Sequence, residues 1–156
     1  MQESPTTRAT DEDVVTLFHN PACTMSRNTL GLIRNAGIEP TIVDYLHDPP
    51  TVVQLAEMIG AAGLSVRGAL RAKGTPYHEL GLGNPALTDA QLLEAMISHP
   101  ILIERPIVST SRGTRLCRPA ERVLEILPRA QRGFFAKENG EIVIGANGQR
   151  IHVRQR

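Results

Sequence analysis

The feature that most constrains the fold is an alternation of strand-like and helix-like sequence near the start of the chain. Residues 14–18 are short, apolar and rich in β-branched side chains, which is typical of a buried strand. Residues 24–36 carry apolar side chains at helical spacing and stop at Gly37, and residues 41–45 form a second β-rich run. Two strands joined by a helix of this length form a βαβ unit, in which the strands pair in parallel.

The middle of the chain is predominantly helical and separates two β-rich parts. Helical patterns cover residues 51–62 and 88–98, with a shorter one over residues 65–73, and Thr51 is suited to cap the first of these helices. We expect this segment, about residues 50–99, to be a helical insert packed over the functional site.

The second β-rich part follows the insert. Residues 105–109 and 114–117 are typical of two strands joined by a turn at residues 111–113, and a helix is predicted over residues 120–127 after Pro119. The order of elements predicts an α/β fold with a mixed β-sheet flanked by helices.

We divide the chain into three parts. The polar residues 1–13 are predicted to be a flexible N-terminal tail, and residues 14–130 are predicted to form one domain. Residues 131–156 form a C-terminal extension, where two β-branched runs joined by an Asn-Gly turn predict a β-hairpin between residues 142–144 and 151–153.

Composition argues against several functional classes. The net charge of +1 gives no general attraction to nucleic acid, and two tyrosines, three phenylalanines and no tryptophan leave few rings for base stacking. No apolar run approaches the ~20 residues of a transmembrane helix, and the first residues lack a secretory pattern. The two cysteines lack the paired spacing of a metal site. We therefore expect a cytoplasmic protein with no bound metal or cofactor, no nucleic-acid partner and no membrane association.

Cys23 stands where the first predicted strand ends and the first predicted helix begins. A helix N-terminus presents unpaired N–H groups and roughly +0.5 of a charge, which favours thiolate over thiol and can hold an oxyanion. A lone cysteine is most often a small buried hydrophobe, but this position, preceded by Pro21, favours a reactive thiol. Ser26 stands where dithiol oxidoreductases carry a second cysteine, so an oxidised adduct at Cys23 requires another thiol to resolve it.

Two further residues have two open interpretations each. His19, four residues before Cys23, either stabilises the thiolate through its charge or hydrogen bonds, or faces solvent at the end of the strand. Cys117 lies in a strand of alternating apolar residues, which favours a buried structural thiol, and its other interpretation is the resolving cysteine.

Three arginines are candidate ligands for an anion: Arg71, Arg105 and Arg118. Most arginines are solvated surface groups, but Arg105 and Arg118 each precede a proline where a loop meets a strand. The guanidinium fork binds tetrahedral oxyanions, and two or three such groups would neutralise an anionic substrate that a thiolate otherwise repels. Whether the three converge is left open by the sequence.

These residues resemble those of the glutaredoxin-coupled arsenate reductases, a family with a thioredoxin-like fold and a helical insert. The resemblance extends over residues 14–128 and rests on His-Asn-Pro-x-Cys at 19–23, Arg-Pro at 105–106 and Arg-Leu-Cys-Arg-Pro at 115–119. The chain departs from the best-known members at residues 24–25, where Thr-Met replaces Gly-Thr and places a bulkier side chain beside the anion cradle.

The resemblance implies reduction of arsenate to arsenite, with glutathione as co-substrate and glutaredoxin as partner. The Cys23 thiolate would attack arsenate to give a thioarsenate adduct, the three arginines would bind the oxyanion, and His19 would lower the pKa of Cys23. Ser26 would support the site, and its lack of a thiol makes the external thiol necessary. Pro106 matches the position of the cis proline in thioredoxin-like folds, so a cis bond is expected there.

Two alternatives belong to other functional classes. Relatives with this fold act as non-enzymatic regulators that bind RNA polymerase and sense oxidants through a Cys-x-x-Cys pair, but Ser26 and the three arginines favour the reductase. A related thiol oxidoreductase with another substrate would need the same arginines, so the sequence leaves it open.

Overall fold

The computed structural model describes residues 13–151. The predicted tail, apart from Asp13, and the end of the predicted C-terminal hairpin, residues 152–153, lie outside the described residues. The described elements are, in chain order, β1 (Thr16–Phe18), α1 (Thr24–Asn35), β2 (Thr41–Val43), α2 (Val52–Ala61), η2 (Arg67–Ala69), α3 (Asp89–Ser98), η3 (Pro100–Leu102), β3 (Ile107–Thr110), β4 (Gly113–Leu116), η4 (Ala120–Glu125), β5 (Phe135–Ala136) and β6 (Ile142–Ile144).

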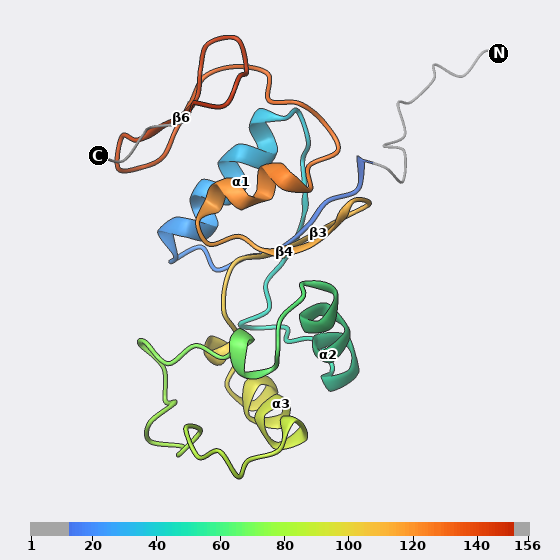
Figure 1. Ribbon diagram of the computed structural model, residues 1–156, viewed down its shortest axis with the longest axis vertical. Helices are drawn as coiled ribbons and strands as arrows, with labels where there is room; N and C mark the ends of the chain where they lie inside the picture. Colours follow the sequence, from blue (N-terminus) through green and yellow to red (C-terminus); the bar gives the residue numbers. More distant parts are fainter. Residues whose placement is uncertain (1–12, 152–156) are drawn as a thin grey trace, which may run out of the picture.

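One mixed sheet contains four of these strands, in the order β2-β1-β3-β4. β1 and β2 pair in parallel, with Leu17 opposite Ile42, so the predicted βαβ unit is confirmed. β3 runs antiparallel to both β1 and β4, which puts the predicted hairpin at one edge of the sheet. A mixed sheet with helices on both faces confirms the predicted α/β class (Figure 1).

Different parts of the chain cover the two faces of the sheet (Figure 1). α1 and η4 pack together on one face, and α2 and α3 lie on the other side. Because side chains alternate along a strand, Val108 joins Leu17, Leu32 and Val123 in the core of the first face, while the preceding Ile107 belongs to the core of the second. The sheet therefore separates the two cores from each other.

The long helices of the middle segment begin where the sequence predicts. Thr51 caps α2, because its hydroxyl accepts a hydrogen bond from the Gln54 N–H (3.1 Å) while the Gln54 side chain accepts one from the Thr51 N–H (3.0 Å). Thr88 and Gln91 form the same capping box at α3. These reciprocal bonds satisfy N–H groups that a helix start otherwise leaves unpaired.

The short helix predicted over residues 65–73 is wrong in extent. Only η2 is helical, because the chain then pairs with the segment before β3: Leu70 forms an antiparallel bridge with Ile103. The Arg71 N–H donates to the Leu102 carbonyl at 2.7 Å. Backbone groups that would continue the helix are thus used in a contact distant in sequence, which local periodicity does not reveal.

The helix predicted over residues 120–127 is present in a tighter form. η4 is a 3-10 helix, and just beyond its end the Ile126 N–H still donates to the Val123 carbonyl three residues back (3.1 Å). The pattern predicted a helix here but did not distinguish the two helix types.

The chain beyond η4 packs on α1. The Asn35 side chain donates to the Gln131 side-chain oxygen and the Gln131 amide donates to the Leu32 carbonyl, both at 2.8 Å. A Cβ atom at Gly31 would lie only 2.5 Å from the Phe135 ring, so glycine allows this close packing. β5 and β6 pair antiparallel, and Ile144 bridges to Arg150. The division of the chain into tail, domain and extension stays a prediction.

Across residues 13–151 no helix combines the length and apolar character needed to cross a membrane. The same residues contain no group of three or more histidine, cysteine or acidic side chains placed to hold a metal ion.

Candidate active site

Cys23 is the N-cap residue of α1, at the turn that follows β1. Its backbone is extended (φ −94°, ψ 120°), and its carbonyl accepts the first helical hydrogen bond from the Arg27 N–H at 3.0 Å. The Asn20 side chain and carbonyl hold the turn by accepting from the N–H groups of Ala22 and Cys23, each at 3.0 Å. The half-buried thiol is thus fixed at the positive end of α1.

The surroundings of Cys23 favour its thiolate. Burial opposes ionisation, but hydrogen bonding and charge from the Arg105 side chain, with the backbone N–H groups of Ser26 and Met25, outweigh it and lower the pKa of the thiol. The structure therefore combines a helix N-terminus with an arginine, the two features that activate cysteine nucleophiles.

His19 is buried against Ser26 rather than facing solvent. Its Nδ1 lies 2.7 Å from the Ser26 hydroxyl, which also accepts from the Asn20 N–H at 3.2 Å. Burial, followed by the charges of Arg34 and Arg27, lowers the pKa of His19, so the neutral ring predominates at neutral pH. Within residues 13–151 no hydrogen bond joins His19 to Cys23, and the contacts favour a role in holding the turn.

The three candidate arginines converge around Glu104. Its carboxylate pairs with Arg71 Nη1 at 2.8 Å and lies 3.8 Å from Arg118 Nε. Arg118 also donates to the carbonyl of Arg105 at 3.0 Å, and Arg105 interacts with Cys23. The three residues are therefore neighbours, and the Glu104 carboxylate pairs with two of the three arginine side chains.

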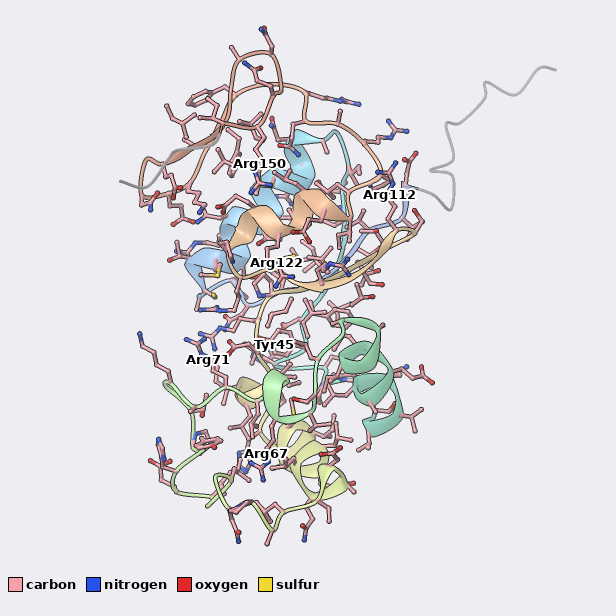
Figure 2. The ribbon with its side chains drawn as sticks, in the orientation of Figure 1. Tyr45, Arg67, Arg71, Arg112, Arg122 and Arg150 are labelled. Atoms are coloured by element: carbon pink, nitrogen blue, oxygen red, sulfur yellow. The ribbon has the colours of Figure 1, made fainter. Side chains whose placement is uncertain are left out.

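Two elements from opposite sides of the molecule position these arginines. Arg105 and Arg118 flank the β3–β4 hairpin, and each is joined to the following proline by a cis peptide bond, as predicted for Pro106. Arg71 comes from the helical side, where the pairing of Leu70 with Ile103 brings it to Glu104. In Figure 2 Arg71 and Tyr45 lie between the sheet and the helices below it.

Glu104 and Tyr45 also belong to this cluster, although neither was predicted from the sequence. Glu104 directly precedes Arg105, but its ion pairs are with Arg71 and Arg118, which are distant from it in the sequence. Tyr45 follows β2, whose parallel pairing with β1 brings the ends of both strands to one edge of the sheet. The predicted βαβ unit was therefore sufficient to suggest that Tyr45 reaches the cysteine turn.

Cys117 lies in a different environment. It is fully buried in the core under α1, and burial raises the pKa of its thiol to about 12. Its backbone N–H donates to the carbonyl of Pro106 at 2.8 Å, so it helps to hold the segment beside Arg105. The structure favours the interpretation of Cys117 as a structural thiol.

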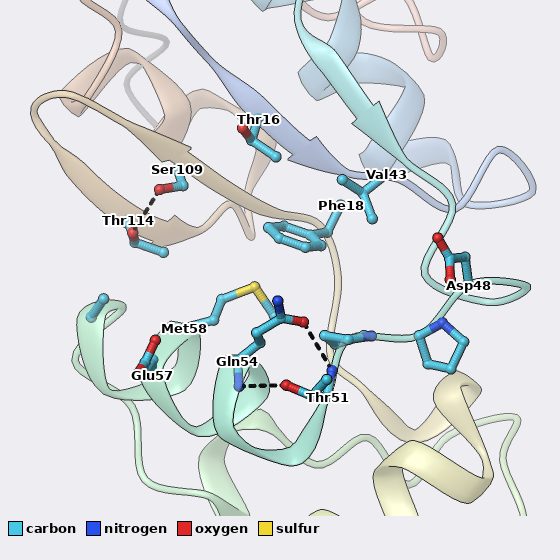
Figure 3. Close-up of a pocket in the computed structure, with 13 residues that line it drawn as sticks. Thr16, Phe18, Val43, Asp48, Thr51, Gln54, Glu57, Met58, Ser109 and Thr114 are labelled. Atoms are coloured by element: carbon cyan, nitrogen blue, oxygen red, sulfur yellow. Dashed lines mark hydrogen bonds between the residues drawn. The ribbon is translucent and has the colours of Figure 1, made fainter. Parts of the chain in front are cut away.

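A separate pocket of about 720 Å³ lies between the sheet and α2 (Figure 3). Phe18 and Met58 face it with apolar groups, and the hydroxyls of Ser109 and Thr114, joined by a hydrogen bond of 3.2 Å, face it from the hairpin. Cys23 and the candidate arginines do not line this pocket, so the pocket and the cysteine site are different places.

Comparisons with known proteins agree with this geometry. A sequence model of the ArsC family matches residues 18–126. The arsenate reductase of Rhizobium meliloti strain 1021 is 61% identical over 137 residues, covering 88% of this chain and 98% of that protein. The arsenate reductase of Escherichia coli K12 is 56% identical over 137 residues, with 88% and 97% covered.

A solved structure confirms the predicted thioredoxin-like fold. The arsenate reductase from Vibrio cholerae superposes with a TM-score of 0.71 at 46% identity, covering 73% of this chain and 98% of that one. The family match, the similar sequences and the similar structure agree, and the chain belongs to the ArsC family.

Proposed function

We propose that this protein is an arsenate reductase that uses Cys23 as its nucleophile. The observation that carries the proposal is the placement of Cys23 at the N-terminus of α1 beside Arg105, where the pKa of its thiol is lowered. Relatives named arsenate reductase that are 56% and 61% identical support this substrate.

The first step joins sulfur to arsenic. The Cys23 thiolate attacks the arsenic of arsenate, and one arsenate oxygen takes up protons and leaves as water, which gives a thioarsenate adduct. Arg71, Arg105 and Arg118 bind the remaining oxygens and offset the repulsion between a thiolate and an anionic substrate. His19 and Ser26 act as positioning residues, because their hydrogen bonds hold the turn that carries Cys23.

The second step reduces arsenic. Glutathione attacks the Cys23 sulfur, the electron pair of the sulfur–arsenic bond passes to arsenic, and arsenite leaves with a mixed disulfide remaining on the protein. Glutaredoxin then takes the glutathionyl group and returns Cys23 to its thiolate. An external thiol is required because Ser26 cannot form a disulfide and Cys117 is fully buried.

The proposed reaction requires no bound metal or cofactor, and glutathione enters as a co-substrate. We propose that the protein acts in the cytoplasm, where glutathione keeps thiols reduced. The same shortage of a second accessible thiol argues against an oxidant-sensing regulator built on a Cys-x-x-Cys pair.

The proposal is tested by following arsenate-dependent NADPH oxidation with glutathione, glutaredoxin and glutathione reductase present. We expect wild-type activity that disappears in Cys23→Ser and when glutathione is omitted, and that persists in Cys117→Ser. A wild-type protein that reduces no arsenate, while Cys23 still reacts with iodoacetamide at neutral pH, would overturn the proposal. Activity supported by thioredoxin in place of glutaredoxin would overturn only the glutathione-dependent steps.

A further inference from the structure

The pairing of β1 with β2 places Tyr45 at the same edge of the sheet as the turn that carries Cys23. Tyr45 follows β2, and the N–H of His19 donates to the carbonyl of Val43 at 3.0 Å, which extends the pairing of β1 with β2 beyond their last paired residues. Cys23 follows β1 within the same turn. The chain therefore holds Tyr45 and Cys23 at one edge of the sheet without relying on any side-chain contact.

The ring of Tyr45 is packed in a core, while its hydroxyl has no hydrogen-bond partner in the described part of the chain. The residue is 2% exposed, and its ring belongs to the core that contains Leu102 and Ile103 on the helical side. The hydroxyl oxygen is itself buried, and no group within residues 13–151 forms a hydrogen bond with it. Buried polar atoms are almost always hydrogen-bonded, so this hydroxyl calls for an explanation.

The charges around that hydroxyl belong to the proposed active site. Burial raises the pKa of Tyr45 to about 12, and the charged groups that act on it are Arg105, Cys23, Glu104 and Arg71. The hydroxyl thus keeps its proton at neutral pH and is available as a donor. The Nε of Arg105 is likewise buried and without a hydrogen-bond partner in the described chain.

Two buried donors, the Tyr45 hydroxyl and Arg105 Nε, therefore lack a partner in the described chain, and the charges of Arg105, Arg71 and Cys23 act on Tyr45. A tetrahedral oxyanion carries several acceptor oxygens, and its charge suits the surrounding arginines. A water molecule or an apolar ligand would not match both the charge and the number of donors.

We propose that the Tyr45 hydroxyl is a further substrate-binding group, which donates a hydrogen bond to an oxygen of the bound oxyanion beside Cys23. This inference rests on the proposed function, since it assigns Tyr45 to the same arsenate site. Tyr45 adds a neutral donor of fixed direction, because its ring is held by the core, to three charged donors on longer side chains.

The test is Tyr45→Phe, which keeps the ring and removes only the hydroxyl. We expect the KM for arsenate to rise about tenfold or more, as for loss of a hydrogen bond to a charged ligand, with a smaller change in kcat. Because the hydroxyl has no hydrogen-bond partner within residues 13–151, we expect the variant to unfold at an equal or higher temperature than the wild type. Weaker substrate binding without loss of stability is the signature of a binding role.

Tyr77→Phe is the matched control. Tyr77 is the second of the two tyrosines, and its side chain packs against the core on the helical side of the sheet. It should leave the KM for arsenate unchanged. A Tyr45→Phe variant with wild-type KM would overturn the inference while leaving the proposed function intact. A variant that loses thermal stability together with arsenate affinity would also overturn it, because the hydroxyl would then be structural.

A direct binding measurement separates this inference from the proposed function. Calorimetric titration of arsenate into Cys23→Ser, and into Cys23→Ser with Tyr45→Phe, reports the oxyanion site without chemistry. If the wild type reduces no arsenate but Tyr45→Phe still weakens binding about tenfold, the reductase proposal fails and the role of Tyr45 stands. If the wild type reduces no arsenate and Cys23→Ser binds none, both fail.

Discussion

The surroundings of the two cysteines differ in every property that sets thiol reactivity. Cys23 is half-buried at a helix N-terminus beside Arg105, and these groups lower its pKa although burial opposes them. Cys117 follows β4 and is fully buried, and burial raises its pKa to about 12. One environment supplies donors to a developing charge, and the other supplies chiefly apolar surface.

The contrast shows that reactivity comes from what surrounds the sulfur. Both cysteines adjoin a strand of the same sheet, yet only Cys23 lies where a strand end, a helix start and an arginine meet. The side chains of Arg115 and Arg122 act on the pKa of Cys117 through their charge alone, and Arg122, which lowers this pKa most among the charged neighbours, does not overcome burial.

The largest expected effect is the difference in alkylation rate between the two thiols. At pH 7 iodoacetamide should modify Cys23 at least about a thousandfold faster than Cys117, because a thiol with the higher pKa is almost entirely protonated and is also shielded. Peptide mapping by mass spectrometry gives both rates in one sample. In guanidinium chloride the two rates should become similar, and comparable rates in the folded protein would contradict the comparison.

Arg105→Ala should move Cys23 toward the behaviour of an ordinary thiol. The arginine favours the thiolate, so its loss raises the pKa of Cys23, and the pH profile of the alkylation rate shifts to higher pH. Arsenate reduction should fall about a hundredfold, since both the thiolate and an oxyanion ligand are affected. Arg112→Ala, at the exposed tip of the hairpin, is the control. An unshifted profile in Arg105→Ala would remove the arginine from the explanation.

Glu104→Gln should increase the affinity of the site for anions. The carboxylate neutralises part of the charge of Arg71 and Arg118, and glutamine keeps the shape while removing that charge. We expect arsenate to bind about three- to tenfold more tightly to Cys23→Ser carrying this change than to Cys23→Ser alone. Weaker binding would mean that Glu104 chiefly holds the arginines in place.

Local features of the sequence were enough to place Cys23. A β-branched run, a turn containing proline and a helical pattern act over a few residues, so they predict the strand-to-helix junction directly. The parallel pairing of β1 with β2 followed from the length of the connection between them. The cis bond before Pro106 followed from the family resemblance rather than from any local rule.

The convergence of the arginines could not be predicted in the same way. Arg71 reaches Glu104 because Leu70 pairs with Ile103, a contact distant in sequence that replaces the end of the short helix predicted over residues 65–73. The position of the Tyr45 hydroxyl depends on the packing of the core on the helical side, and no pattern of residue types predicts that a hydroxyl has no partner in the described chain. The positions of Arg71 and Tyr45 in the site therefore depend on contacts between segments that are distant in sequence.

The smallest expected effect on activity belongs to Cys117→Ala. The substitution removes a fully buried sulfur from the core under α1, so we expect a loss of roughly 1–2 kcal/mol in the free energy of unfolding, measured by urea denaturation. Arsenate reduction with glutathione and glutaredoxin should stay within about twofold of wild type, because a shielded thiol with a raised pKa cannot attack an adduct on Cys23.

Cys117→Ser separates packing from chemistry in this prediction. It replaces the thiol with a hydroxyl of similar size, which is placed in an apolar core. The variant should therefore be at least as destabilised as Cys117→Ala and equally active. If both folded variants lost more than about tenfold of their activity, and thioredoxin supported the wild type, Cys117 would be the resolving thiol. The two cysteines would then be partners in one reaction, and the core around Cys117 would have to open during each turnover, because its sulfur is fully buried in the structure.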